Sequence, residues 1–208
     1  MRVEKIELSY VSENCYLVLS DRGAIVIDPG CYDERIEKFL LDNSDKERMI
    51  LLTHCHFDHI GGAETLRKKF NIKIGIGKLD NNGLSDADIN LSNYFGFPVK
   101  PFSADKMFDD EETFAVGDMS VKVIHTPGHT KGSVCYLINN SLFSGDMLFK
   151  NSYGRTDFPT GSTTEIVKSF YKIINELDGS TAVFSGHGDD TTVAQEKSNN
   201  PINYMSVI

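Results

Sequence analysis

Three histidines and an aspartate lie within six positions of one another in the segment 53–62, which reads Thr-His-Cys-His-Phe-Asp-His-Ile-Gly-Gly. Imidazole nitrogens and carboxylate oxygens are ligands for zinc and other divalent metals. In an extended segment side chains alternate between faces, so His54 and His56 project to the same side. Asp58 and His59 follow in a bend and face a different way. This arrangement is typical of two adjacent metal ions rather than of one closed structural site.

The elements around this segment explain how such a site could form. The apolar run 49–52 predicts a strand that ends at the histidines, and the bend is expected to open one helix over 58–70. Three further strand-like runs also end in His or Asp beside Gly, at His129, Asp146 and His187. We expect these strand tips to converge on one edge of a sheet sandwich, where small residues leave room for ions and a substrate.

The predicted ligands divide into two sets of three that share one carboxylate. They are His54, His56 and His129 for one metal, Asp58, His59 and His187 for the other, and Asp146 as the bridge. His125 lies inside a strand before its turn and is predicted to be structural. Asp28 lies at a strand tip in Asp-Pro-Gly, where it is either a turn former or an acceptor that orients a metal-binding histidine.

The rest of the chain predicts strands with helices outside them. The expected strands are 3–10, 14–20, 24–28, 72–76, 114–116, 119–125, 133–138, 141–143 and 181–184, the first three forming an antiparallel meander. The expected helices are 33–43, 163–177 and a last turn at 192–197. The polar segment 78–106 predicts a long excursion outside the regular layers, of a kind that is often functional.

Composition narrows the class of protein. With 208 residues and 40% hydrophobic residues, the chain can bury a full core, and we expect one domain over 1–208. The net charge of -9, with scattered basic residues, argues against nucleic-acid binding. No signal-like or membrane-spanning apolar stretch is visible, so we expect a cytoplasmic protein that binds no membrane. The four cysteines form no CxxC pair and are expected to be reduced, with Cys55 in the core rather than catalytic.

The histidine segment, with His129, Asp146 and His187, resembles the HxHxDH pattern and the later ligands of the metallo-β-lactamase superfamily, and 27–30 resembles that family's first motif. The resemblance implies an α+β fold, an αββα four-layer sandwich of two mixed sheets flanked by helices. The segments 154–157 and 191–201 are most similar to the short branch of glyoxalase II-like hydrolases (hydroxyacylglutathione hydrolase-like), which lacks the glutathione-binding helical domain.

The resemblance implies a dinuclear hydrolase that acts on a small-molecule thioester. Two divalent ions, zinc first and iron or manganese as alternatives, would lie roughly 3.5–4 Å apart and lower the pKa of a shared water toward neutrality. Asp58 is the expected catalytic residue, because it would ligate one metal and orient the attacking hydroxide. Arg155 is expected to hold either a substrate carboxylate or the fold's own loop. The sequence leaves the oligomeric state open.

Other functions remain possible for the same residues. The segments 53–56 and 154–158 also resemble persulfide dioxygenases, in which His54, His129 and Asp146 would bind a single iron. A lactonase or another ester or amide hydrolase is the next alternative, and a β-lactamase is weakened by the absent secretion signal. A metal-binding or scaffolding protein without turnover is the alternative from a non-enzyme class.

Overall fold

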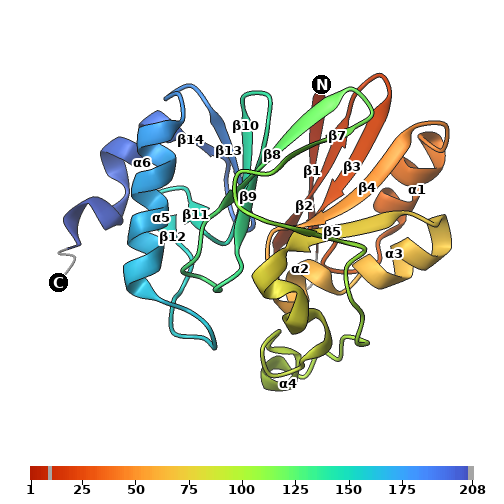
Figure 1. Cartoon of the computed structure of the whole chain (residues 1–208), viewed down its shortest axis with the longest axis horizontal. Helices are drawn as coiled ribbons and strands as arrows, with labels where there is room; N and C mark the ends of the chain where they lie inside the picture. Colours follow the sequence, from red (N-terminus) through yellow and green to blue (C-terminus); the bar gives the residue numbers. More distant parts are fainter. Residues whose placement is uncertain (9–10, 206–208) are drawn as a thin grey trace.

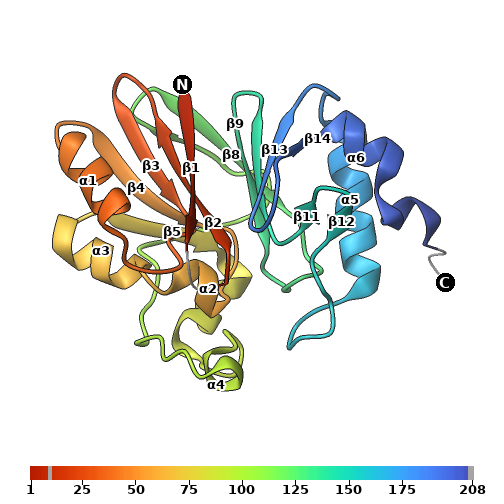
Figure 2. The same cartoon turned by 180° about the vertical axis from the view of Figure 1, so that it is seen from behind.

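The structure, a computed structural model, describes residues 1–8 and 11–205. Two six-stranded sheets pack face to face, and helices cover their outer faces (Figures 1 and 2). The fold is therefore α+β, and the four-layer αββα sandwich predicted from the sequence is confirmed. Within the described parts of the chain, no helix has the length and apolar character needed to cross a membrane.

In the first sheet, six strands lie side by side in the same order as along the chain. They are β1 (Arg2–Leu8), β2 (Glu13–Leu19), β3 (Gly23–Ile27), β4 (Glu47–Leu52), β5 (Lys73–Gly77) and β6 (Lys106–Phe108). The strands β1 to β3 form the predicted antiparallel meander, and the pairs from β3 to β6 are parallel. The predicted end of the first strand, at 9–10, lies outside the described residues. Helices α1 (Glu34–Asp42) and α3 (Ala63–Phe70) pack on this sheet through Ile36, Leu40 and Leu66.

The second sheet has the order β14-β13-β10-β9-β8-β7. Its strands are β7 (Thr113–Val116), β8 (Met119–His125), β9 (Val134–Ile138), β10 (Ser141–Gly145), β13 (Ala182–Ser185) and β14 (Thr191–Thr192). The strands β10 and β13 are parallel, and the other pairs are antiparallel. Helices α5 (Thr163–Glu176) and α6 (Val193–Asn199) cover the outer face, with Ile166 and Phe170 fully buried.

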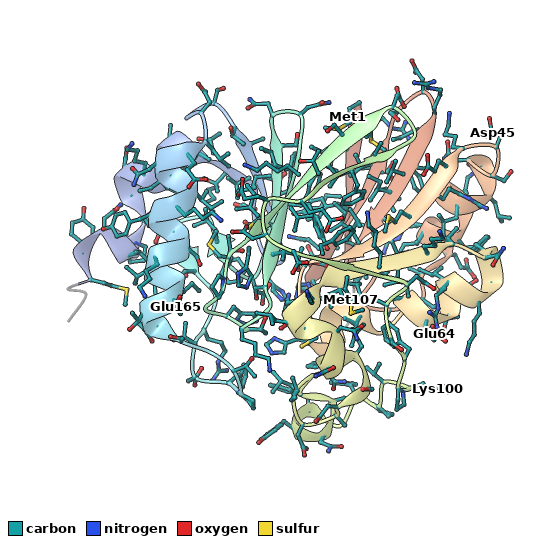
Figure 3. All side chains as sticks on the ribbon, viewed as in Figure 1. Met1, Asp45, Glu64, Lys100, Met107 and Glu165 are labelled. Carbon is teal, nitrogen blue, oxygen red and sulfur yellow. The ribbon has the colours of Figure 1, made fainter. Side chains whose placement is uncertain are left out.

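The core between the sheets fixes their relative position. Ile25 and Ile27 of β3 face the second sheet, whereas Val26 faces the helices, so this strand is apolar on both faces. The Tyr16 ring lies edge-on to Phe143 at 5.4 Å between centroids, and its hydroxyl donates to the carbonyl of Ser185 at 2.7 Å. Side chains fill the space between the two sheets (Figure 3). The core therefore holds the strand ends of both sheets at fixed positions.

The structure differs from the sequence prediction in three places. The helix expected over 58–70 is two helices, α2 (Phe57–Ile60) and α3, with Gly61 and Gly62 between them. A Cβ at either glycine would collide with the carbonyl oxygen of Gly30 or Cys31, so the chain passes these loops too closely for a side chain. The 78–106 excursion contains η1 (Lys78–Ser85) and α4 (Ser92–Phe95) and leads into β6, an edge strand too short to predict.

The third difference concerns short elements near the chain's carboxyl end. A two-stranded hairpin, β11 (Leu148–Phe149) and β12 (Ser152–Tyr153), follows Asp146, and η2 (Pro201–Tyr204) follows α6. Two-residue strands carry no periodicity, so the sequence could not predict them. The hairpin leads the chain from Asp146 into the loop that carries Arg155.

Candidate metal centre

The seven side chains predicted as ligands meet at one end of the sandwich. They follow β4, β8, β10 and β13, so both sheets contribute to the cluster. Asp146 lies in its middle: its Oδ2 is 3.5 Å from Nε2 of His129 and 3.6 Å from Nε2 of His187, and its Oδ1 is 3.3 Å from Nε2 of His59. Asp146 thus contacts histidines of both predicted sets.

The first set of side chains is entirely imidazole. His54, His56 and His129 offer nitrogen atoms that lie within 4.8 Å of one another, and all three residues are buried. Nδ1 of His56 is 2.9 Å from Nε2 of His129. Burial first, and then the neighbouring histidines, hold the pKa of His54 well below its usual range and lower that of His56 to about 3. These two rings are therefore neutral at pH 7, which is the form that binds a metal.

The second set combines two imidazoles and a carboxylate. Asp58, His59 and His187 offer ligand atoms within 4.8 Å of one another, with Oδ2 of Asp58 3.5 Å from Nε2 of His187. Burial acts to lower the pKa of His59, but the carboxylates of Asp146 and Asp58 raise it well above its usual range. The two carboxylates therefore favour a positive charge on or beside His59, and a divalent cation can take the place of the proton at Nε2.

Four of the histidines have one ring nitrogen fixed by an oxygen atom outside the cluster. These contacts are His54 Nδ1 with Thr53 Oγ1 at 3.1 Å, His59 Nδ1 with Asp28 Oδ2 at 3.0 Å, His129 Nδ1 with the Arg155 carbonyl at 2.7 Å, and His187 Nδ1 with the Ser12 carbonyl at 3.2 Å. A proton on Nδ1 leaves the lone pair of the neutral ring on Nε2, which faces the cluster. Metal-binding histidines are commonly oriented in this way.

Asp28 combines both roles that the sequence left open. It lies at the turn after β3 with φ of +50°, and its carbonyl accepts a hydrogen bond from Gly30 at 3.0 Å. Its Oδ2 accepts from the Thr53 hydroxyl at 2.6 Å and from His59 Nδ1, and its Oδ1 accepts from the Thr53 amide at 2.8 Å. Through Thr53 it also orients His54. One buried carboxylate therefore positions a histidine of each set.

Asp80 is a second buried carboxylate of this kind, and sequence reasoning missed it. Its oxygens accept hydrogen bonds from the Cys55 amide at 3.0 Å, the Thr130 hydroxyl at 2.7 Å and the Gly132 amide at 2.8 Å. It therefore ties the segment of His54 and His56 to the loop of His129. Asp80 stands among Asn and Asp residues of the excursion, so no pattern distinguished it. The Cys55 side chain lies in the core, as predicted.

Glu13 was also missed, although the sequence contained a signal for it. It opens the strand Glu-Asn-Cys-Tyr-Leu-Val-Leu, in which a carboxylate is unexpected, and it is only 1% exposed. Neither of its carboxylate oxygens has a hydrogen-bond partner among the described residues, and Oε1 lies 3.8 Å from Nδ1 of His59. Burial raises the pKa of Glu13 well above its usual range. Glu13 is therefore a buried carboxyl group that lies directly beside the cluster.

The cluster fits a divalent cation because its central atoms lack other partners. Nε2 of His54, Nε2 of His59 and Oδ1 of Asp146 are buried, and no hydrogen-bond partner exists for them within the described chain. A buried polar atom without a partner costs about 1–3 kcal/mol. His54, His59 and Asp146 also form a group whose ligand atoms lie within 4.8 Å of one another, and three unpartnered atoms in such a group are poorly explained by the fold alone. Imidazole and carboxylate are donors that zinc, iron and manganese accept.

A cavity of about 380 Å³ opens over the cluster and is lined in part by Asp58, Asp146 and Arg155. The Arg155 guanidinium donates to both carboxylate oxygens of Asp157, at 2.7 and 2.6 Å, and lies 3.9 Å from the Phe158 ring centroid. Arg155 thus contacts its own loop at the edge of the cavity. His125 lies outside the cluster, where its Nε2 contacts the Lys131 carbonyl at 2.9 Å.

Comparison with known proteins defines the class. The model of the family described as "Metallo-beta-lactamase superfamily" matches residues 9–187, so the chain belongs to this superfamily. The family assignment made from the motif is therefore confirmed, and the protein is a metallo-hydrolase by family. The "Probable metallo-hydrolase YqgX" of Bacillus subtilis (strain 168) is 32% identical over 204 residues, which is 97% of each chain.

Three further relatives are informative. The "Hydroxyacylglutathione hydrolase GloC" of Haemophilus influenzae is 32% identical over 206 residues and 97% of each chain. The protein in the crystal structure of the BLEG-1 B3 metallo-beta-lactamase shares 35% sequence identity with this chain. The two structures match with a TM-score of 0.87 over 96% of this chain and 98% of that one. TTHA1623, whose crystal structure is in a di-iron-bound form, shares 30% sequence identity with this chain. Its structure matches with a TM-score of 0.83 over 95% of this chain and 98% of that one.

Proposed function

We propose that this protein is a dinuclear metal-dependent hydrolase that cleaves a thioester of the hydroxyacyl-thiol type. One observation carries the proposal: of two adjacent three-residue clusters, one of imidazoles and one of mixed ligands, each has a histidine within 3.5 Å of the Asp146 carboxylate. His54, His56 and His129 would hold one metal, and Asp58, His59 and His187 the other. The presence of both sets supports two ions rather than the single iron of a dioxygenase.

Zinc is the metal that we propose first, because tetrahedral sites with imidazole and carboxylate ligands suit it. Iron is the second choice, because the similar TTHA1623 structure is in a di-iron-bound form. When bound, such a pair of ions polarises a substrate carbonyl and generates hydroxide from water at neutral pH. Both sheets supply ligands, so we also propose that residues 1–208 act as one domain.

The chain's own residues supply orientation and proton transfer. The Asp58 side chain is 15% exposed and lines the cavity, so its carboxylate can accept a hydrogen bond from the attacking water. Asp28 and the Arg155 carbonyl keep protons on Nδ1 of His59 and His129. A thiolate leaving group needs little acid assistance because thiol pKa values lie near 8.5. Thioester cleavage therefore does not require a dedicated acid at the centre.

The substrate class is supported by similarity to GloC, which covers 97% of both chains. The experiment is to load the purified protein separately with zinc, iron and manganese, count metals per chain by mass spectrometry, and assay thioesters, lactones, a β-lactam and a persulfide. We expect two metals per chain and thioester cleavage. One iron per chain with oxygen uptake on the persulfide would instead indicate a dioxygenase, and preference for the lactone or β-lactam would reassign the substrate.

A further inference from the structure

Four phenylalanine rings form a continuous row from the metal centre outward, which we call the aromatic wall: Phe57, Phe95, Phe97 and Phe158. The Phe158 ring contacts that of His56 at 5.9 Å between centroids, and it contacts Phe95 at 6.1 Å. Phe57 stacks on Phe95 and on Phe97, each at 5.3 Å. The wall therefore begins at a proposed metal ligand and extends away from it.

Three separate segments supply these rings. Phe57 belongs to the histidine segment, Phe95 and Phe97 to the excursion, and Phe158 to the loop after β12. The excursion is attached to the histidine segment by the Phe57 amide, which donates to the carbonyl of buried Asn90 at 2.9 Å. The wall thus has a defined position relative to the cluster. The excursion therefore supplies two of the four rings of the wall.

The wall presents apolar surface to the cavity over the metal centre. Phe57, Phe95 and Phe158 line that cavity, and Val11, Phe149 and Tyr153 also line it. Phe57 is only 7% exposed because its neighbours cover it, whereas Phe95 is 48% exposed. A half-exposed phenylalanine that stacks on a buried one is a site where an apolar ligand group gains contact area.

The charges around the cavity argue against an anionic arm at this wall. Among the described residues that line the cavity, Arg155 is the only Lys or Arg, and its guanidinium is paired with both carboxylate oxygens of Asp157. A carboxylate on the substrate would have to compete with Asp157 for that guanidinium. An uncharged arm meets no such competition.

We propose that the aromatic wall binds an apolar acyl group of the substrate, either aryl or medium-length alkyl. This inference rests on the proposed thioesterase function and changes one part of it: the preferred acyl group is apolar rather than a small hydroxyacyl group. The carbonyl lies at the metal centre beside His56, and the acyl group extends along Phe158 and Phe95. The enzyme accordingly prefers apolar acyl groups to small hydroxyacyl groups on the same thiol.

The test compares benzoyl, hexanoyl and lactoyl thioesters of one neutral thiol, N-acetylcysteamine, with the zinc-loaded protein. We expect kcat/KM for the benzoyl and hexanoyl thioesters to exceed that for the lactoyl thioester by about tenfold or more, the discrimination that an apolar pocket can supply. In Phe95→Ala the ratio of kcat/KM for the benzoyl thioester to kcat/KM for the lactoyl thioester should fall by about tenfold. Equal rates for all three acyl groups in the unaltered protein would overturn the inference.

The matched control is Tyr94→Ala, because Tyr94 is the neighbouring residue on α4, is 67% exposed and does not line the cavity. This variant should retain the preference of the unaltered protein, and loss of preference in both variants would assign the effect to α4 as a whole and overturn the role of the ring.

The affinity for a benzyl thioether, which cannot be hydrolysed, distinguishes the proposed thioesterase function from the proposed apolar site at the wall. Isothermal titration calorimetry measures this affinity. If no thioester is cleaved but the thioether binds and Phe95→Ala weakens its binding about tenfold, the reaction is wrong and the apolar site stands. If thioesters are cleaved but the thioether binds the unaltered protein and Phe95→Ala equally, the proposed role of the wall is wrong and the proposed function stands. Failure of the thioether to bind the unaltered protein also overturns the wall.

Discussion

The metal centre has two halves by position in the chain, the segment 53–62 and the later loops, and these are held in different ways. The segment 53–62 contributes four proposed ligands from one contiguous stretch, and two buried carboxylates, Asp28 and Asp80, fix it through hydrogen bonds. The later loops contribute His129, Asp146 and His187, and the two histidines are oriented by main-chain carbonyls of Arg155 and Ser12. A main-chain carbonyl is still present when the side chain of its residue is substituted, whereas a side-chain carboxylate is lost. The first half should therefore be far more sensitive to single substitutions among the residues that support its ligands.

The largest effect is expected for Asp58→Asn, which changes the proposed catalytic residue of the first half. The amide keeps the side-chain volume but removes the carboxylate that orients water, so we expect kcat to fall by about 100-fold or more. Steady-state thioester hydrolysis measures this fall, and circular dichroism checks that the fold is intact. Unchanged hydrolysis in this variant would contradict the mechanism.

Asp28→Asn is expected to weaken metal binding without contacting the metal. The amide cannot accept hydrogen bonds from Thr53 and His59 at both of its positions, so the rings of His54 and His59 lose their orientation. Loss of such a partner typically lowers metal affinity by about 10–100-fold. Competition with a chelator measures the affinity.

Asp42→Asn is the matched control for Asp28→Asn, because the exposed Asp42 side chain forms a surface ion pair with Lys38 at the end of α1. It should bind metal like the unaltered protein. Equal affinity in the Asp28 and Asp42 variants would show that the buried carboxylate does not position the histidines.

Asp80→Asn is expected to have a smaller effect on metal binding and a clear effect on stability. One amide group cannot accept from the Cys55 amide, the Thr130 hydroxyl and the Gly132 amide together, so a buried donor is left unpaired. The free energy of unfolding should fall by about 1–3 kcal/mol, measured by urea titration of the metal-free protein. A variant as stable as the original would show that Asp80 does not tie the two loops together.

Arg155→Ala is expected to have the smallest effect, and it tests the second half of the comparison. The carbonyl that orients His129 remains, and the guanidinium pair with Asp157 is solvent-exposed, so metal affinity and the unfolding midpoint should stay unchanged. Hydrolysis of a neutral thioester should also be unchanged. A fall confined to substrates with a carboxylate would assign Arg155 to substrate binding, and a fall in metal affinity would contradict the backbone role.

The metal centre was more predictable than its surroundings because its residues follow a sequence pattern that recurs along the chain. His or Asp beside Gly at the end of a strand recurs at positions 54–59, 129, 146 and 187, and strand ends meet at the edge of a sheet. The alternation that placed Cys55 away from His54 and His56 is a local property of extended backbone. Asp80 and the aromatic wall follow no local period, because their roles come from contacts across 25 or more residues.

The sequence by itself determined the family, the layered α+β architecture and the set of side chains that could hold two metals, because periodicity and ligand spacing are local properties of the chain. Only the tertiary structure decided which oxygens orient those side chains, that Glu13 lies buried beside His59, and that Phe57, Phe95 and Phe158 face one cavity. These contacts join segments distant in sequence, and the packing of the two sheets, rather than any local preference, brings them together.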